Sequence, residues 1–95
     1  ITHAAWTFSA DGSNCDAARA QALVRGYLCE IALTDAEHAA LPTLARGAAL
    51  RFLLTRAHDW VHTPADALVT RKDPSPFLSR LLRYRADDAA SLFAA

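Results

Sequence analysis

Apolar residues recur at three- and four-residue spacing along the first half of this 95-residue chain. The clearest run consists of Ala17, Ala20, Val24, Tyr27, Leu28 and Ile31. This spacing places the run on one face of an α-helix, which Asn14 is suited to cap. Alanine is abundant, Gly and Pro are few, and β-branched residues do not cluster, so helix propensity dominates. The sequence therefore predicts an all-α fold without strands.

The middle of the chain carries start and stop signals for two more helices. Thr34 followed by Glu37 is a capping box, in which a hydroxyl and a carboxylate satisfy backbone N–H groups at a helix start. A short helix should therefore begin at Asp35. Because Pro42 cannot continue that helix but suits the first turn of another, we expect a separate helix over residues 43–62.

The two ends of the chain complete a predicted helical bundle of about five helices. Residues 1–9 are predicted to be the tail of a helix, closed by a turn at residues 10–13. Residues 63–75 form a Pro-containing loop in this interpretation, and Ser75 with Pro76 then provides a helix cap and first turn. A last helix should run from Phe77 onward.

The helix predicted at residues 43–62 is apolar over most of its circumference, which is typical of the central helix of a bundle. Its expected buried residues are Leu44, Ala45, Ala48, Ala49, Phe52, Leu53, Ala57 and Trp60. Its polar stripe consists of Arg51, Thr55, Asp59 and His62. In the last helix, Leu78, Leu81 and Leu82 should face the core, and Arg80 and Arg83 should face solvent.

Charge and cysteine content narrow the class of protein. Residues 1–50 carry three Arg against five acids, and residues 51–95 carry seven Lys or Arg against five acids. This mild asymmetry gives no reason to expect a nucleic-acid partner. No apolar run is long enough for a membrane span, and no signal-peptide pattern is present. Cys15 and Cys29 would lie about 21 Å apart on one helix, so we expect reduced thiols and a cytoplasmic location.

The chain begins at Ile1 and contains no Met. We therefore expect it to be a processed product or a segment of a longer protein. One domain or subdomain is the most that its length allows.

His58 and His62 lie four residues apart with Asp59 between them, as in the zinc-binding helix of metalloproteases. Asp59, however, is one methylene shorter than the Glu that acts as base in that motif, and no third ligand follows. The two His are more simply interpreted as surface residues at a helix end, where the helix dipole favours positive charge. No metal ligand is assigned.

Arg51 and Asp59 need partners if they lie among packed apolar side chains. They are two helical turns apart and do not pair with each other, whereas Arg56 and Asp59 have the spacing of a surface ion pair. Arg51 is expected to bond to a loop carbonyl or to a carboxylate elsewhere in a parent protein.

The segment Leu44–Phe77, LARGAALRFLLTRAHDWVHTPADALVTRKDPSPF, resembles the C-terminal helical region of homoserine kinases, which belong to the aminoglycoside-phosphotransferase and choline-kinase-like family. The resemblance includes residues 14–27 and 33–37 and extends to Arg83. It implies that residues 1–95 form the C-terminal helical subdomain of a protein-kinase-like fold. The Gly-rich loop, the H-x-D-x-x-x-x-N loop and the metal-binding Asp motif of such kinases are not in this sequence.

The resemblance implies that the full-length protein transfers the γ-phosphoryl group of ATP to the hydroxyl of L-homoserine in threonine biosynthesis. ATP and Mg²⁺ would be bound mainly by the N-terminal part, so no catalytic residue is assigned here. The helices of this segment would shape the acceptor pocket, where an Arg can hold the substrate carboxylate in a bidentate fork. The substrate-binding candidates by position are Trp6, Arg51, Arg56 and Trp60. The expected partners are the small-molecule substrate and the remainder of the polypeptide.

Two alternatives stay open at this point. A sibling kinase that acts on choline, methylthioribose or an aminoglycoside would share the fold, since fold does not fix substrate. A helical interaction module without catalysis would instead unfold cooperatively by itself.

Overall fold

The computed structural model of the chain describes residues 6–64 and 71–94. Within these residues it contains α1 (Ala17–Glu30), α2 (Asp35–His62), α3 (Ser75–Tyr84) and the short 3-10 helix η1 (Ala89–Phe93). No strand is present in this part of the chain, and one isolated β-bridge joins Phe8 to Cys15. The prediction of an all-helical chain is confirmed. The expected bundle of about five helices is not, because the described residues form three α-helices and η1.

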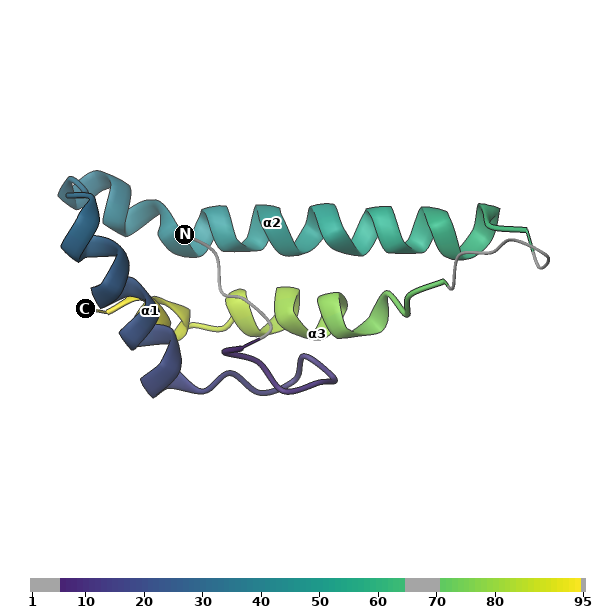
Figure 1. Cartoon of the computed structure of the whole chain (residues 1–95), viewed down its shortest axis with the longest axis horizontal. Coiled ribbons are helices and arrows are strands. Elements are labelled where there is room, and N and C mark those ends of the chain that lie inside the picture. Colours follow the sequence, from purple (N-terminus) through teal and green to yellow (C-terminus); the bar gives the residue numbers. More distant parts are fainter. Residues whose placement is uncertain (1–5, 65–70, 95) are drawn as a thin grey trace.

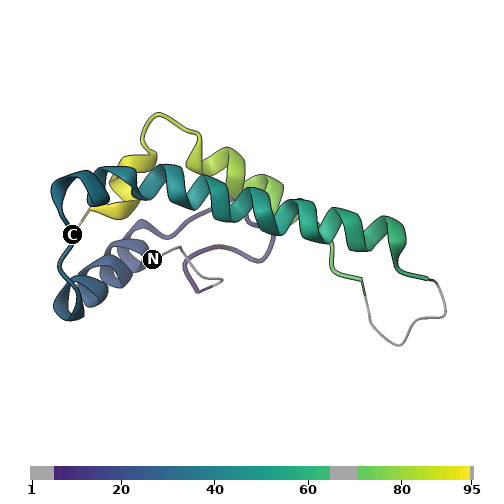
Figure 2. The same cartoon turned by 90° about the horizontal axis from the view of Figure 1, so that it is seen from above.

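α2 spans the whole length of the molecule, and α3 runs antiparallel to it along one side (Figure 1). α1 crosses the other end, where η1 packs against both α1 and α2. Figure 2, seen from above, shows the same elongated arrangement, whose extents are 48 × 25 × 20 Å. The radius of gyration is 14.9 Å, whereas a compact domain of this length has about 12 Å. The described residues therefore cover only one side of α2. The expectation that residues 43–62 form the central helix of a bundle is wrong for this part of the chain.

The segment that precedes α1 is a turn rather than a helix. Residues 1–5 of the predicted first helix lie outside the described residues, and residues 6–9 are not helical. The predicted turn at residues 10–13 is confirmed, with Gly12 at a positive φ of 75°. The Asp11 carboxylate accepts hydrogen bonds from the amide and hydroxyl of Ser13 and from the hydroxyl of Ser9, and these bonds lower the pKa of Asp11 to about 2.

α1 begins later than the sequence predicts. The side chain of Asp16, not Asn14, caps it by accepting a bond from the Arg19 backbone N–H at 3.2 Å. Asn14 is instead tied into the turn, because its carbonyl accepts from the Ser9 N–H at 2.8 Å. Ala20 and Val24 of the predicted apolar stripe are buried as expected, whereas Ala17 and Ile31 are exposed.

α2 starts and ends where the sequence predicts. Both bonds of the Thr34–Glu37 capping box are present, and the helix ends at His62. Pro42, however, lies inside one continuous helix, so the predicted break there is wrong. The proline removes the bond that its missing N–H would donate. Buried Leu41 and Ala45 on either side stabilise the uninterrupted helix against this loss.

The buried core lies where α1, the first half of α2, the end of α3 and η1 meet. Its largest side chains are Phe8, Val24, Leu41, Tyr84, Leu92 and Phe93. The rings of Phe8 and Tyr84 meet edge to face with centroids 5.5 Å apart. η1 supplies Leu92 and Phe93 to this core; the sequence analysis predicted one helix from Phe77 onward, whereas α3 ends at Tyr84 and η1 is a separate helix.

Several burial expectations for α2 and α3 are wrong. Ala45 and Ala49 are buried as predicted, but Leu44, Phe52 and Trp60 are exposed. Leu78 and Leu82 are also exposed, and Leu81 packs against the core. Arg80 and Arg83 are partly buried rather than solvated, because α3 turns this side toward the N-terminal segment and η1. Arg83 Nη1 pairs with Asp88 Oδ1 at 2.9 Å.

The start of α3 also differs slightly from the prediction. Pro74 is the cap residue, and Ser75 and Pro76 occupy the first helical turn. The Asp73 carboxylate accepts bonds from the amide and hydroxyl of Ser75, which lower the pKa of Asp73. None of the described helices is both long and apolar enough to cross a membrane.

Replacing Gly12 by Ala should destabilise the protein. A Cβ at this position would overlap the carbonyl of Pro76 at the start of α3, and the positive φ disfavours any L side chain. We expect the free energy of unfolding of the full-length protein to fall by roughly 1–3 kcal/mol, measured by denaturant titration. The control is Gly26→Ala in α1, where an added Cβ meets no described atom within 4 Å. It should leave stability unchanged or raise it, and equal losses in the two variants would contradict the assigned role of the turn.

Candidate functional site

Phe77, near the start of α3, is the centre of a cluster of aromatic rings and guanidinium groups. Its ring stacks on Phe52 of α2 with centroids 5.1 Å apart. The guanidinium carbon of Arg56 lies 4.4 Å from the Phe77 centroid, and that of Arg80 lies 4.5 Å from it. Arg80 also contacts the Phe8 ring at 5.2 Å. The antiparallel packing of α2 and α3 thus brings two cations together on one ring.

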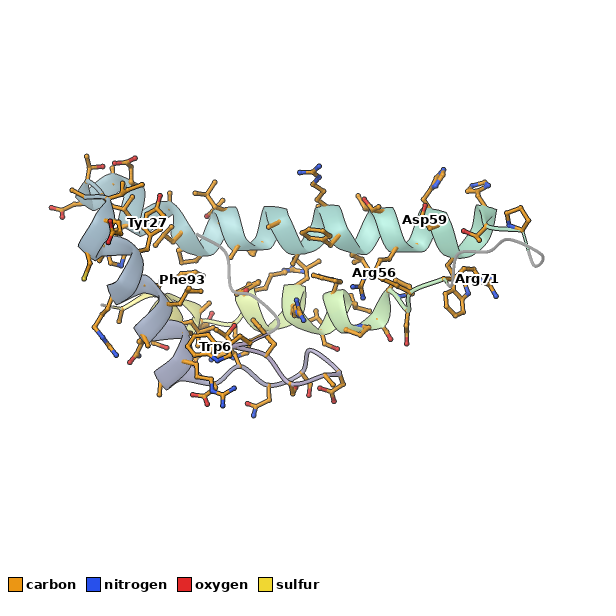
Figure 3. The ribbon with its side chains drawn as sticks, viewed as in Figure 1. Trp6, Tyr27, Arg56, Asp59, Arg71 and Phe93 are labelled. Atoms are coloured by element: carbon orange, nitrogen blue, oxygen red, sulfur yellow. The ribbon has the colours of Figure 1, made fainter. Side chains whose placement is uncertain are left out.

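Helical spacing explains how this cluster forms. Phe52 and Arg56 are four residues apart on α2, and Phe77 and Arg80 are three residues apart on α3. Side chains at these spacings lie on the same face of a helix. When α2 and α3 pack side by side, the two Phe–Arg pairs therefore meet. Arg56 lies between the two helices (Figure 3).

Neither cation of the cluster has a carboxylate partner among residues 6–64 and 71–94. Arg56 Nη1 donates to the backbone carbonyl of Asp73 at 3.1 Å. Arg80 Nε is buried and has no hydrogen-bond partner in this part of the chain. Desolvation by burial lowers the pKa of Arg80, and the nearby charge of Arg56 lowers it further. Arg80 nevertheless stays protonated at neutral pH.

Two neighbouring guanidinium groups with free donors can bind an anion. Arginine presents its donors in a planar fork that matches a carboxylate or phosphate, and partial burial strengthens the attraction. A partly buried charge without a partner is costly, so such groups are more common where a ligand completes the site. We therefore take the Phe52, Arg56, Phe77 and Arg80 cluster, referred to below as the arginine cluster, as the candidate functional site.

The structure brings together two of the four site residues predicted from the sequence. Arg56 and Trp60 lie one turn apart on the same face of α2. Arg51 lies about 140° around the helix from Arg56, is exposed, and forms no hydrogen bond or ion pair with the described residues. Trp6 lies beside the lower part of α1, apart from Arg56, which lies between α2 and α3 (Figure 3). A role in substrate binding stays a prediction for all four.

The two tryptophans each contact an arginine. The Arg71 guanidinium carbon lies 4.4 Å from the Trp60 ring, and Arg71 Nη1 donates to the Trp60 carbonyl at 2.8 Å. The Arg19 guanidinium carbon lies 5.6 Å from the Trp6 ring, and Arg19 Nη1 donates to the Trp6 carbonyl at 3.1 Å. Both rings remain about half exposed, so each contacts its arginine at the surface rather than filling the core: Arg19 comes from α1, and Arg71 comes from the loop before α3.

The sequence analysis missed Arg80, which it placed in solvent. The sequence signal that points to Arg80 is its position three residues after Phe77. This is close to the four-residue spacing between Phe52 and Arg56. The predicted Arg56–Asp59 ion pair is wrong, because Arg56 turns toward Asp73 and Phe77. Asp59 instead lies 3.6 Å from His58 on the exposed side of α2.

The rings of the two histidines near the end of α2, His58 and His62, lie against each other in a tilted arrangement with centroids 4.4 Å apart. In the described part of the chain, no three residues of the types His, Cys, Asp and Glu are grouped so that they could hold a metal ion. Cys15 and Cys29 are both free thiols, and burial raises the pKa of Cys15.

No family model matches the chain. Over most of its length, however, the chain is similar to curated homoserine kinases. The homoserine kinase of Gluconacetobacter diazotrophicus is 62% identical over 82 residues, which are 86% of this chain and 25% of that relative. Those of Gluconobacter oxydans and Zymomonas mobilis are 54% and 53% identical over 86% and 97% of this chain. The chain spans about a quarter of the length of these curated relatives. The predicted likeness to homoserine kinases is thereby confirmed, whereas the wider kinase-like family and fold stay predictions.

Arg80 should contribute little to stability, because burial of its unpaired Nε offsets the contacts with the two rings. We expect Arg80→Met, which keeps an unbranched side chain against Phe8 and Phe77, to leave the unfolding midpoint of the full-length protein unchanged or higher. Phe77→Ala, which removes the shared ring, should lower the free energy of unfolding by roughly 2–4 kcal/mol. Thermal and denaturant melts of both variants test this. A loss for Arg80→Met as large as that for Phe77→Ala would mean that Arg80 is a structural residue.

Proposed function

We propose that this chain is the C-terminal part of a homoserine kinase. The full-length protein would transfer the γ-phosphoryl group of ATP to the hydroxyl of L-homoserine and form O-phospho-L-homoserine for threonine biosynthesis. The observation that supports this most directly is the 62% identity to a curated homoserine kinase over 86% of the chain. Identity at this level over nearly the whole segment favours homoserine over the acceptors of sibling kinases, which a shared fold alone does not distinguish.

The proposed division of labour assigns the chemistry to the remainder of the polypeptide. Phosphoryl transfer depends on positioning of the two substrates and on charge neutralisation at the phosphates. The phosphate-binding loop, the catalytic loop and the metal-binding Asp are not in this sequence, so ATP and Mg²⁺ would be bound mainly outside it. The elongated shape and the exposed apolar side chains of α2 also favour a lobe of a larger enzyme over an independent interaction module.

Within this segment, the arginine cluster is the best candidate for an acceptor-binding site. L-homoserine carries a carboxylate, and Arg56 and Arg80 together offer donors that no described carboxylate occupies. Holding that carboxylate would orient the substrate hydroxyl toward the phosphoryl group, which lowers the entropic cost of the reaction. Trp60, one turn beyond Arg56, would form a wall of the same pocket. Arg51 and Trp6 do not face this cluster and are weaker candidates.

Activity of the full-length protein tests the proposed function. With ATP and Mg²⁺ it should phosphorylate L-homoserine, and the product can be identified by phosphorus NMR. The acceptor panel should include choline, methylthioribose and an aminoglycoside as alternatives. Turnover of one of these in preference to homoserine would replace the proposed acceptor while keeping a kinase. No phosphorylation of any acceptor by a folded, ATP-binding protein would overturn the kinase assignment.

Arg56→Gln in the full-length enzyme should raise KM for L-homoserine by roughly 10- to 100-fold, the effect of losing a hydrogen bond to a charged group, with a smaller change in kcat. The acceptor aminopropanol, which is homoserine without its carboxylate, should lose much less in the same variant because it never makes the bond. Arg85→Gln, an exposed arginine beyond the end of α3, is the control and should leave both constants unchanged. Equal losses for the two acceptors would exclude Arg56 from carboxylate recognition without affecting the assignment as a kinase.

A further inference from the structure

α2 carries a second apolar stripe on the side that faces away from the core. The stripe has the alternating three- and four-residue spacing of a heptad pattern. Its members are Ala36, Ala40, Thr43, Gly47, Leu50, Leu54, Ala57 and Val61. Leu54 lies about 180° around the helix from the buried Ala45. Leu50, Leu54 and Val61 are exposed, with 74% of the Val61 surface open to solvent.

Gly47 lies within this stripe, and no contact or backbone conformation in the described chain requires a glycine at this position. It is helical, does not adopt a positive φ, and an added Cβ would meet no described atom within 4 Å. Glycine is among the least favourable residues within a helix, and its usual role there is to let another backbone approach closely. The stripe has small residues at the end that includes Gly47 and larger residues at the other end. A second helix could therefore approach α2 closely near Gly47 and diverge from it at a shallow angle toward the larger side chains.

The borders of the stripe indicate the charge of whatever covers it. Arg46 and Arg51 lie on opposite sides of Gly47, and no Asp or Glu occurs between His38 and His58. The described residues give Arg46 only a bond to the Thr43 hydroxyl at 3.3 Å, and they give Arg51 no hydrogen bond or ion pair. A second copy of this surface would set its own arginines against these two. A covering helix with carboxylates along its edge would pair with them instead.

We propose that a helix from the remainder of the full-length polypeptide packs along this stripe, with its closest approach at Gly47 and a carboxylate facing Arg51. The inference rests on the proposed function only in that the chain is part of a longer enzyme. The curated relatives have about three quarters of their length outside the matched segment, which is ample for such a helix. α2 would then be covered on two sides, by α3 and the core on one and by this helix on the other.

Thiol labelling of the full-length protein tests the proposal with a matched pair of leucines. Leu54, in the stripe, is 59% exposed, and Leu82, on α3 and outside the stripe, is 56% exposed. Leu54→Cys should react with iodoacetamide at least roughly tenfold more slowly than Leu82→Cys, because a covered thiol reacts only when the structure opens. Mass spectrometry of the labelled peptide separates these sites from Cys29, which is exposed. Similar rates for the two variants, fast or slow, would overturn the proposal.

The dependence on protein concentration identifies the covering element. Protection of Leu54→Cys that persists in a monomeric, dilute sample supports an intramolecular helix. Protection that disappears on dilution would assign the stripe to a second copy and overturn the proposed occupant. Homoserine kinase activity of the same samples is measured separately, so loss of the proposed function and loss of the proposed packing are distinguishable.

Gly47→Ala provides a second measurement that does not depend on cysteine variants. On an exposed helix this substitution raises the melting temperature, as we expect for the control Gly26→Ala. If a helix approaches closely at Gly47, the substitution should instead lower the melting temperature of the full-length protein by several degrees. A rise equal to that of Gly26→Ala would overturn the close approach. Should a cysteine variant fail to fold, hydroxyl-radical footprinting of Leu54 and Leu82 in the unaltered protein gives the same comparison.

Discussion

The arrangement of this chain depends on the burial of Leu92 and Phe93, two residues of the short η1 helix. Both are almost completely enclosed, and they lie where α1 and α2 meet. Among the elements that α1 contacts, η1 makes the most extensive contact. η1 therefore attaches α1 to the rest of the molecule. Polar contacts also join α1 and α2 to η1. His38 of α2 donates to the Phe93 carbonyl at 2.6 Å, and Gln21 of α1 donates to the Ser91 carbonyl at 3.0 Å. Removing these two apolar side chains would therefore separate three elements at once.

With one end held in this way, α2 acts as the scaffold of the segment. Its first half packs against η1 and contributes Leu41 and Ala45 to the core that α1 shares, and its second half extends beyond this core with α3 alongside. The extended half carries both features that point outside the segment. One face contributes Phe52 and Arg56 to the arginine cluster, and another face carries Leu50, Leu54 and Val61. In the proposed homoserine kinase, such a helix would separate the substrate pocket from the body of the enzyme.

Local sequence signals predicted the elements where the deciding contacts are also local. The capping box of Thr34 and Glu37 requires only residues within one turn, and it forms as predicted. The turn at residues 10–13 likewise depends on Gly12 and on short bonds to Asp11. The burial of Ala20, Val24, Ala45 and Ala49 followed from helical spacing alone. The candidate site was predictable only in part, because Arg56 was named from its position while Arg80 was assigned to solvent.

The sequence by itself determined that the chain is helical, where α2 begins and ends, and which relatives it resembles, since these depend on propensity, capping and residue identity. Tertiary structure alone decided whether Pro42 ends a helix, which side of α2 is covered, and where Arg80 lies. Each of these outcomes depends on contacts between residues far apart in the chain: Leu41 and Ala45 are held in the core around Phe93, and Arg80 is held between Phe8 and Phe77. A helical pattern states which residues share a face, but only the packed neighbours determine which face is buried.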